Sequence, residues 1–176
     1  MAFGQYNLAR IQTLQPAVQP LATRLVELGR EQGINLEIVS AYRSASEQDA
    51  LLKSGAGVTK ASALLSFHNH GLAFDVVPQE YKAQVDWNPS GALWPRVGLL
   101  GESLGLEWGG RWSDPDRPHF QLSAAPIREL KDYWEKFGRW MPVSIEPTMG
   151  AAGIIVLIGV LYLLVLRPML ARRGYV

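Results

Sequence analysis

Two short segments hold all three histidines of this 176-residue chain, and each places them beside a carboxylate. The first, SFHNHGLAFD, spans residues 66–75 and contains His68, His70 and Asp75. The second, DRPH, contains Asp116 and His119. A catalytic zinc usually has three protein ligands drawn from imidazoles and carboxylates, with a fourth position open for water. The two segments therefore contain the parts of a zinc hydrolase site.

The spacing within the first segment predicts a turn. His68 and Asp75 would lie roughly 23 Å apart on an unbroken strand and about 10 Å apart along a helix. Neither geometry lets both side chains bind one ion. Residues 69–71, Asn-His-Gly, are typical of a turn because Asn tolerates and Gly favours positive φ. We therefore expect His68 before a turn and Asp75 on a buried strand over residues 72–77.

His119, at the start of the apolar run HFQL, is the natural third ligand. Asp116 lies in a loop between Pro115 and Pro118, where a carboxylate that is not a ligand can accept a proton from the attacking water. We expect His70 in the turn or beside a ligand, because groups that orient ligands are common around such ions. The alternative is that His70 is itself a ligand. A single His or Asp is more often structural or solvated, so the interpretation depends on all these residues occurring together.

The first segment fits the pattern S-x-H-x-x-G-x-A-x-D, with SAYRS upstream and WGG followed by D-x-x-H downstream. The matched positions are Ser66, His68, Gly71, Ala73 and Asp75. With these motifs the chain resembles the zinc-dependent peptidoglycan peptidases of the D-alanyl-D-alanine carboxypeptidase and L-alanyl-D-glutamate endopeptidase family (peptidase M15-like). The closest likeness is to phage endolysins of the endopeptidase branch, and it covers about residues 5–122.

The resemblance implies a role for each matched residue. Zinc would bind His68, Asp75 and His119, and Asp116 would be the general base. Arg43, in SAYRS, would steady the substrate carbonyl and the oxyanion formed from it, which suits a guanidinium that is always charged and donates in a planar fork. A surface salt bridge is the alternative role for Arg43.

Further residues at family-like positions are expected at the substrate. Ser66 and Gln48 are candidates for substrate contact. Trp108, with Trp112, would line a cleft, although aromatic residues at this spacing also occur in cores. Arg111 departs from the pattern, because relatives often have an acidic residue there, and this leaves the charge preference of that edge of the cleft open.

Together with the resemblance, the remaining pattern of helices and strands implies an α+β domain in which a small, mostly antiparallel sheet with flanking helices carries one zinc site. This is the architecture of hedgehog-like and D-alanyl-D-alanine peptidases. Ser44 and Glu47 form a capping box. Helices are expected over residues 16–32, 47–53, 94–104 and 126–137, and strands over residues 36–41, 72–77 and from 119 onward.

Charge and composition exclude some classes of protein. Residues 1–147 hold 14 basic and 16 acidic residues, which gives a net charge of 14 − 16 = −2 without a basic patch. No nucleic-acid partner is therefore expected. The absence of cysteine excludes a disulfide framework. The first 15 residues lack the pattern of a cleavable signal peptide, and the sequence does not indicate an oligomeric state.

Residues 149–166 are 18 consecutive residues without a charge, long enough to span a hydrocarbon core of about 30 Å. A buried core helix would show a polar face, which this segment lacks. Arg167, Arg172 and Arg173 follow it, so the positive-inside rule places the tail in the cytoplasm and the enzyme in the periplasm of a Gram-negative cell. Since no export signal is evident, the reverse topology stays open. The predicted organisation is a peptidase domain (1–138), a linker (139–148), a transmembrane helix (149–166) and a basic tail (167–176).

The predicted function is zinc-dependent hydrolysis of the peptidoglycan stem peptide at the membrane. The resemblance favours an L-alanyl-D-glutamate endopeptidase that acts as a phage or prophage endolysin. A D,D-carboxypeptidase that releases terminal D-alanine is the first alternative. A noncatalytic, membrane-anchored peptidoglycan-binding module is the second, although such a module has no need of a general base.

Overall fold

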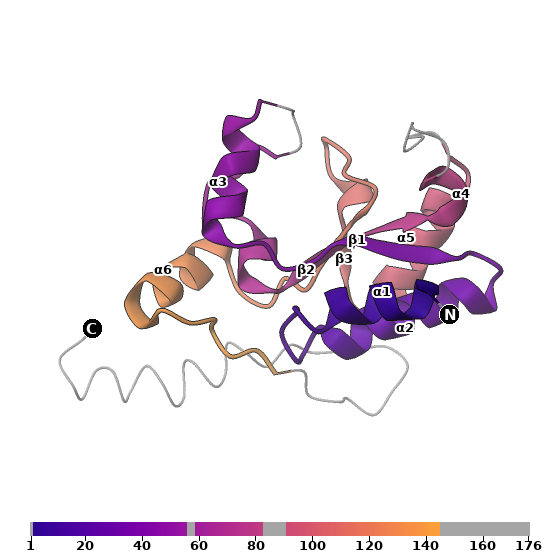
Figure 1. The fold of residues 1–176 in the computed structure, drawn as a ribbon, viewed down its shortest axis with the longest axis horizontal. Helices are drawn as coiled ribbons and strands as arrows, with labels where there is room; N and C mark the ends of the chain where they lie inside the picture. The colour runs from indigo at the N-terminus through magenta and orange to yellow at the C-terminus, as the bar shows by residue number, and fades with distance from the viewer. Residues whose placement is uncertain (1, 56–58, 83–90, 145–176) are drawn as a thin grey trace.

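The computed structural model describes residues 2–55, 59–82 and 91–144 (Figure 1). Its α-helices are α1 (Ala2–Ile11), α2 (Gln19–Glu31), α3 (Ala45–Lys53), α4 (Gln79–Lys82), α5 (Leu93–Ser103) and α6 (Ile127–Phe137). Two 3-10 helices are η1 (Phe67–His70) and η2 (Gly109–Arg111). The strands are β1 (Leu36–Ser40), β2 (Ala73–Pro78), β3 (Glu107–Trp108) and β4 (His119–Gln121).

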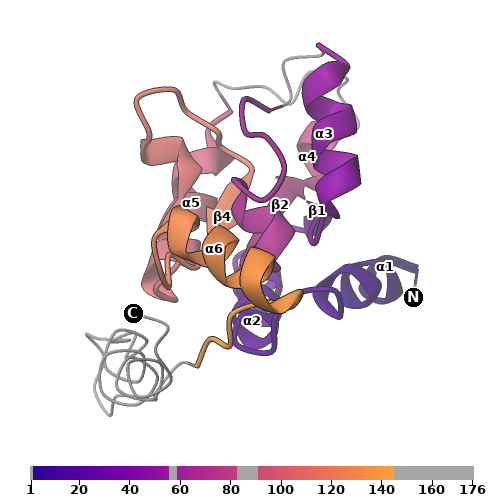
Figure 2. The same cartoon turned by 90° about the vertical axis from the view of Figure 1, so that its left-hand side faces the viewer.

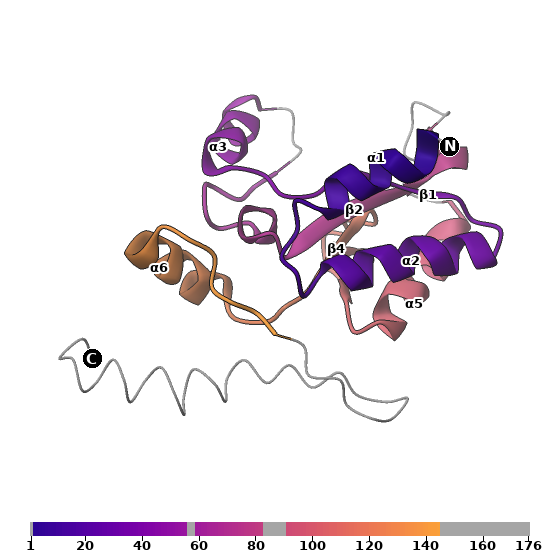
Figure 3. The same ribbon diagram turned by 60° about the horizontal axis from the view of Figure 1, so that its bottom comes forward.

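The strands form one four-stranded sheet in the order β1-β2-β4-β3, and every neighbouring pair is antiparallel. This confirms the predicted α+β fold with a small antiparallel sheet. Figure 1 shows α1 and α2 on one side of the sheet and α3 on the other. The helix α6 lies beyond one end of the sheet (Figure 3), and from that end it is in front of β2 and β4 (Figure 2).

The register separates an apolar face of the sheet from a polar one. Phe120 of β4 pairs with Phe74 of β2 and with Trp108 of β3. The three rings stack on the core side, with centroids 6.1 and 6.5 Å apart. Because successive side chains of a strand alternate between faces, Asp75 and His119, one position along, lie on the opposite face.

Helix α5 covers the apolar face at close range. A Cβ atom built on Gly101 would lie 2.2 Å from Phe120, and one built on Gly98 would lie 2.3 Å from Trp108. Only glycine allows this approach without displacing the rings. The core under β4 therefore fixes the strand that carries His119.

Most predicted elements are present with shifted ends. The capping box at the start of α3 is formed, with Ser44 and Glu47 bonded reciprocally. Gly138 ends α6 in the left-handed conformation. The elements α1, α4 and β3 were not predicted. Helix α1 is held to β1 by the buried Asn7, which bonds the backbone of Leu36 and Ile38.

The predicted linker, residues 139–148, is docked where the structure describes it. Trp140 donates from Nε1 to the carbonyl of Asn69 at 3.1 Å, and Met141 is buried in the core. The described part of the predicted linker, residues 139–144, therefore packs against the peptidase domain. The predicted transmembrane segment, 149–166, lies outside the described residues. Among the described helices, none is long and apolar enough to cross a membrane.

Candidate metal centre

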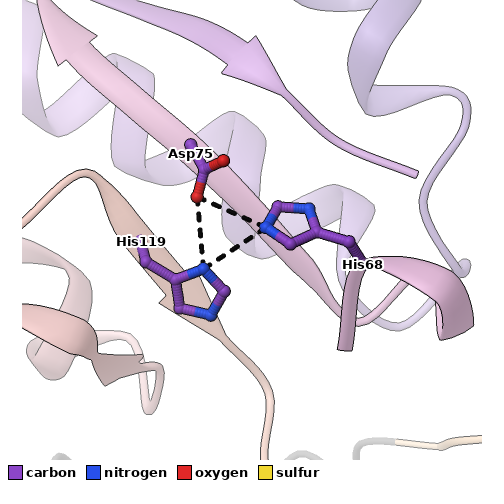
Figure 4. Close-up of side chains that lie close together, drawn as sticks. All are labelled: His68, Asp75 and His119. Atoms are coloured by element: carbon purple, nitrogen blue, oxygen red, sulfur yellow. Dashed lines mark hydrogen bonds and ion pairs between the residues drawn. The ribbon is translucent and has the colours of Figure 1, made fainter. Parts of the chain in front are cut away.

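Three elements bring His68, Asp75 and His119 together at one end of the polar face of the sheet (Figure 4). His68 lies on η1, which ends at Gly71 in the left-handed conformation with φ 64°. The chain then turns directly into β2, where Asp75 pairs in register with His119 of β4. Cross-strand neighbours have Cβ atoms about 5 Å apart. The predicted turn thus exists as a 3-10 helix.

The three donor atoms form a nearly equilateral triangle. Asp75 Oδ1 is 3.3 Å from His68 Nε2 and 3.2 Å from His119 Nδ1, and the two nitrogens are 3.3 Å apart. In a tetrahedron, ligand atoms lie about 1.6 times the metal–ligand distance apart. Zinc bonds of about 2.0–2.1 Å therefore require separations of about 3.3 Å. The donor set fits a tetrahedral divalent cation.

Hydrogen bonds on the far side of each ring fix which nitrogen faces the centre. His68 Nδ1 lies 2.7 Å from the carbonyl oxygen of Ala41 and donates to it. His119 Nε2 lies 3.0 Å from Gln121 Oε1 and donates to it. Each ring consequently directs its other nitrogen to the metal position, where it can bind a cation once it has lost its proton, as is usual for metal-binding histidines.

The electrostatics of the metal-free site favour an ion pair. Burial alone would raise the pKa of Asp75, but the charge of His68 and hydrogen bonds from both rings lower it well below its usual range. Burial would lower the pKa of His119, yet the hydrogen bond to Asp75 and the charge of that carboxylate raise it. A cation that binds here therefore displaces a proton from a site that already holds a negative charge.

Asp116 lies next to the centre but outside the triangle of donors. Its backbone N–H donates to Gly109 O at 3.0 Å, and its carbonyl accepts the N–H of His119 at 3.2 Å. A Cβ atom on Gly109 would lie 2.5 Å from Asp116 O, so this approach requires glycine. The residue is exposed, yet partial desolvation of its carboxyl group and the charge of Asp75 raise the pKa of Asp116. A carboxylate whose pKa is raised is a better proton acceptor.

Arg43 follows β1 at the edge of this site. Its guanidinium donates to Gln48 Oε1 at 2.9 Å and to Ser40 Oγ at 3.2 Å. These are the bonds of the guanidinium group within the described part of the chain. Two residues of the protein therefore fix the direction of the guanidinium group.

Gln48 takes a different position from the predicted substrate contact. It is fully buried, and its amide nitrogen donates to Thr59 Oγ1 and Ala61 O while its oxygen accepts from Arg43. All of these contacts are internal, so Gln48 orients Arg43 and the segment after α3. Ser66 is half-buried immediately before η1, and its carbonyl accepts the N–H of Asn69.

Trp108 is also placed differently from the prediction. The register with Phe120 puts it on the apolar face, where it is 5% exposed and donates from Nε1 to Arg117 O. Trp112 lies at the site instead, with its ring centroid 5.1 Å from that of His119. Arg111, the residue that departs from the family pattern, forms a two-point ion pair with Glu102 at 2.9 and 3.1 Å. This ion pair neutralises the charge of Arg111.

His70 is not among the donors. It is fully buried with Nε2 2.9 Å from the carbonyl oxygen of Leu64, and its Nδ1 has no hydrogen-bond partner among the described residues. Burial lowers the pKa of His70. The ring is therefore neutral and packs under the turn.

Sequence reasoning missed the residues that support the donors. Gln121 holds His119 and is itself bonded by its amide nitrogen to Glu107 and Ser123. Glu107 also accepts the indole N–H of Trp112 at 2.6 Å. The alternation of strand HFQ was the available signal, because it places Gln121 on the same face as His119.

Comparisons with known proteins relate this chain to peptidoglycan peptidases. A family model described as D-alanyl-D-alanine carboxypeptidase matches residues 59–122. The chain is 34% identical over 122 residues to the peptidoglycan L-alanyl-D-glutamate endopeptidase CwlK of Bacillus subtilis, which covers 62% of this chain and 73% of that protein.

A second relative is the L-alanyl-D-glutamate peptidase of Listeria phage A118, 34% identical over 122 residues. The match covers 66% of this chain but 41% of the phage protein, so the chain spans about two fifths of its length. Among solved structures, the L-Ala D-Glu endopeptidase ChiX of Serratia marcescens matches 73% of this chain and 90% of its own, with 22% identity and a TM-score of 0.49.

Proposed function

Because this chain belongs to the D-alanyl-D-alanine carboxypeptidase family, peptidase family M15, we propose that it is a zinc-dependent L-alanyl-D-glutamate endopeptidase of the peptidoglycan stem peptide. The observation that carries the proposal is the donor triangle of His68, Asp75 and His119, whose edges of 3.2 and 3.3 Å suit tetrahedral zinc. The two relatives described above are named for cleavage at L-alanyl-D-glutamate. One of them belongs to a phage, which supports the role of a phage or prophage endolysin.

The residues divide the chemistry as follows. A zinc ion, when bound, supplies Lewis acidity and lowers the pKa of a water ligand towards about 7. Asp116 accepts a proton from the attacking water and returns it to the leaving amine. Arg43 donates hydrogen bonds to the oxygen on which negative charge develops, an interaction that strengthens in the transition state. His68 and His119, each held by a hydrogen bond on its outer nitrogen, keep the site in one geometry.

The proposal extends to where the enzyme acts. Residues 149–166 would anchor it in the membrane by a single helix, with the peptidase domain in the periplasm and residues 167–176 in the cytoplasm. The supporting observations are the 18 uncharged residues and the arginines Arg167, Arg172 and Arg173 that follow.

The test is mass spectrometry of disaccharide-pentapeptide muropeptides from Gram-negative peptidoglycan after incubation with the full chain in mild detergent. A peptide with a new N-terminal D-glutamate is the expected product. Loss of D-alanine alone would identify the carboxypeptidase instead. Intact substrate in the presence of added zinc, with a folded protein that still retains peptidoglycan in a pull-down, would support the noncatalytic binding module.

Two controls link the product to the site. Asp116→Asn should bind zinc with the affinity of the original chain while turnover falls by about 10²–10⁴-fold. Removal of the metal by a chelator should abolish turnover, and stoichiometric zinc should restore it. Near-normal turnover in the Asp116→Asn variant would show that another group accepts the proton.

A further inference from the structure

Asn69, the residue after His68, makes an unusually complete set of hydrogen bonds. It is 1% exposed. Its Nδ2 donates to the carbonyl oxygens of Arg43 at 2.8 Å and Ser44 at 3.3 Å, while its Oδ1 accepts the backbone N–H of Leu64 at 3.0 Å. The nitrogen of the Asn69 amide faces two carbonyl oxygens and its oxygen faces an N–H, so only one orientation of the amide satisfies all three bonds. The side chain therefore joins three segments at fixed positions.

The backbone of Arg43 is bonded to η1 through both its N–H and its carbonyl. The backbone N–H of Arg43 donates to His68 O at 3.1 Å, and its carbonyl accepts from Asn69. Both polar groups of the Arg43 main chain are thus bonded to two consecutive residues of η1. One of those residues, His68, provides a donor atom to the metal centre. The backbone of Arg43 is therefore tied to the metal centre through η1.

The side chain of Arg43 is held separately. Gln48 and Ser40 orient its guanidinium, and they belong to α3 and β1 rather than to η1. Gln48 and Ser40 set the direction of the guanidinium group, whereas Asn69 sets the distance between the backbone of Arg43 and His68.

Trp140 braces Asn69 from behind. Its indole Nε1 donates to Asn69 O at 3.1 Å, and its ring meets Tyr42 edge-on with centroids 5.2 Å apart. Tyr42 precedes Arg43 in the chain. The indole of Trp140 thus contacts both Asn69 and the residue before Arg43. A Cβ atom on Gly71 would lie 3.2 Å from this indole.

We propose that Asn69 is a positioning residue for the reaction, which sets Arg43 at the distance from the metal centre that oxyanion stabilisation requires. The inference rests on the proposed function, in which Arg43 donates to the oxyanion. A misplaced donor is most costly in the transition state, where the bond is strongest. Loss of Asn69 should therefore lower kcat and leave KM nearly unchanged.

The first test compares Asn69→Ala with Asn69→Asp in the full chain. Asp retains an acceptor for the N–H of Leu64 but places a carboxylate against the carbonyls of Arg43 and Ser44. We expect both variants to lose at least about tenfold in kcat, with Asp as damaging as Ala. A normal kcat in Asn69→Asp would mean that only the bond to Leu64 matters, and this would overturn the proposal.

Asn7→Ala is the matched control for stability. Asn7 is also buried and also bonds two backbone groups, those of Leu36 and Ile38, in the contact between α1 and β1. Asn7→Ala should lower the midpoint of thermal unfolding as Asn69→Ala does, but it should leave kcat unchanged. An equal loss of kcat in both variants would reduce the role of Asn69 to general stability.

A double-mutant cycle with Arg43→Ala tests whether Asn69 acts through that residue. In the Arg43→Ala background, Asn69→Ala should cause no further loss of kcat, because the donor that it positions is gone. Zinc affinity, measured by competition with a chelator, should change less than about threefold in Asn69→Ala, since the ring of His68 is held by Ala41. Additive losses of kcat, or a large loss of zinc affinity, would contradict the inference.

Hydrogen exchange provides a readout without activity. The Arg43 amide, bonded to His68 O, should exchange slowly in the original chain and at least about tenfold faster in Asn69→Ala. If the original chain cleaves no muropeptide, the proposed function fails, and this measurement still decides whether Asn69 fixes Arg43. Unchanged protection would show that it does not.

Discussion

At the residue scale, the geometry of the metal centre depends on groups that are not themselves donors to the metal position. Asp75 is held between two imidazoles, and each imidazole is held on its outer side by an oxygen, from Ala41 or from Gln121. One of these oxygens belongs to the backbone and cannot be removed by substitution. The other is a side chain, so it can be tested directly.

Gln121→Leu should weaken zinc binding by about 10–100-fold, because His119 then loses the acceptor for its Nε2 proton and its ring can rotate or change tautomer. Competition with a zinc chelator measures the affinity. The control is Ser123→Ala, which removes one bond to the amide nitrogen of Gln121 and leaves the oxygen that faces His119. An unchanged affinity in Gln121→Leu would show that strand register alone orients the ring.

The sequence was sufficient to predict which residues meet at the centre but not the detailed contacts around it. His68, Asp75 and His119 were identified by residue type, by the turn between the first two and by the family resemblance, and the structure brings them together. The positions of Trp108 and Gln48 depend on strand register and on burial. Both arise from contacts between distant segments, which a single sequence does not specify.

At the element scale, α3 begins immediately after Arg43, so its N-terminus affects the site. Ser44 Oγ accepts the N–H of Glu47, and Glu47 accepts the N–H and the hydroxyl of Ser44. The hydrogen bonds from the Ser44 side chain and backbone lower the pKa of Glu47. The stability that comes from a lowered carboxyl pKa is present above the unfolded pKa and is lost as the pH falls through the folded one.

Ser44→Ala should therefore lower the free energy of unfolding by about 1 kcal/mol at neutral pH, and by less at a pH below the usual range of carboxyl groups. Urea unfolding at the two pH values measures this difference. In a Glu47→Gln background the cost of Ser44→Ala should no longer depend on pH, because the ionisable partner is absent. If Ser44→Ala lowered the free energy of unfolding by more at acidic pH than at neutral pH, the capping box would not be the origin of the effect.

The packing of α5 on β4 gives the second prediction at this scale. Gly101→Ala should destabilise the protein by about 1–3 kcal/mol, because the new methyl group overlaps Phe120, the neighbour of His119. Gly4→Ala, in α1 with nothing within 4 Å of the new Cβ atom, should instead stabilise it by about 0.5–1 kcal/mol. Thermal unfolding of both variants tests the difference, and a neutral Gly101→Ala would show that α5 can move away from the sheet.

At the scale of the whole molecule, the site is built from residues beyond the segment that the family model matches. Residues 59–122 contain the three donors, yet Arg43 lies before this range and Trp140 after it. Gln15, near the N-terminus, bonds the carbonyls of His70 and Gly71. These contacts could not be predicted from the sequence because they join positions up to 71 residues apart.

Trp140 also places the C-terminal segment close to the catalytic turn, since it contacts Asn69 directly. If the chain is anchored through residues 149–166, as proposed, the anchor follows Trp140 closely in the sequence. This makes the proposed membrane attachment a question about the enzyme as well as about its location.

A charge at the centre of residues 149–166 tests that attachment. Leu157→Arg replaces a residue that favours insertion with one that opposes it by about 3 kcal/mol, so the variant should move from the membrane fraction to the soluble fraction after an alkaline wash. Leu99→Arg makes the same change at a position that is 57% exposed in α5, and this variant should stay with the membranes. Since both variants keep the donors of the metal centre, both should hydrolyse muropeptides in detergent. If the original chain is already soluble without detergent, residues 149–166 do not anchor it, and the periplasmic orientation inferred from Arg167, Arg172 and Arg173 loses its basis.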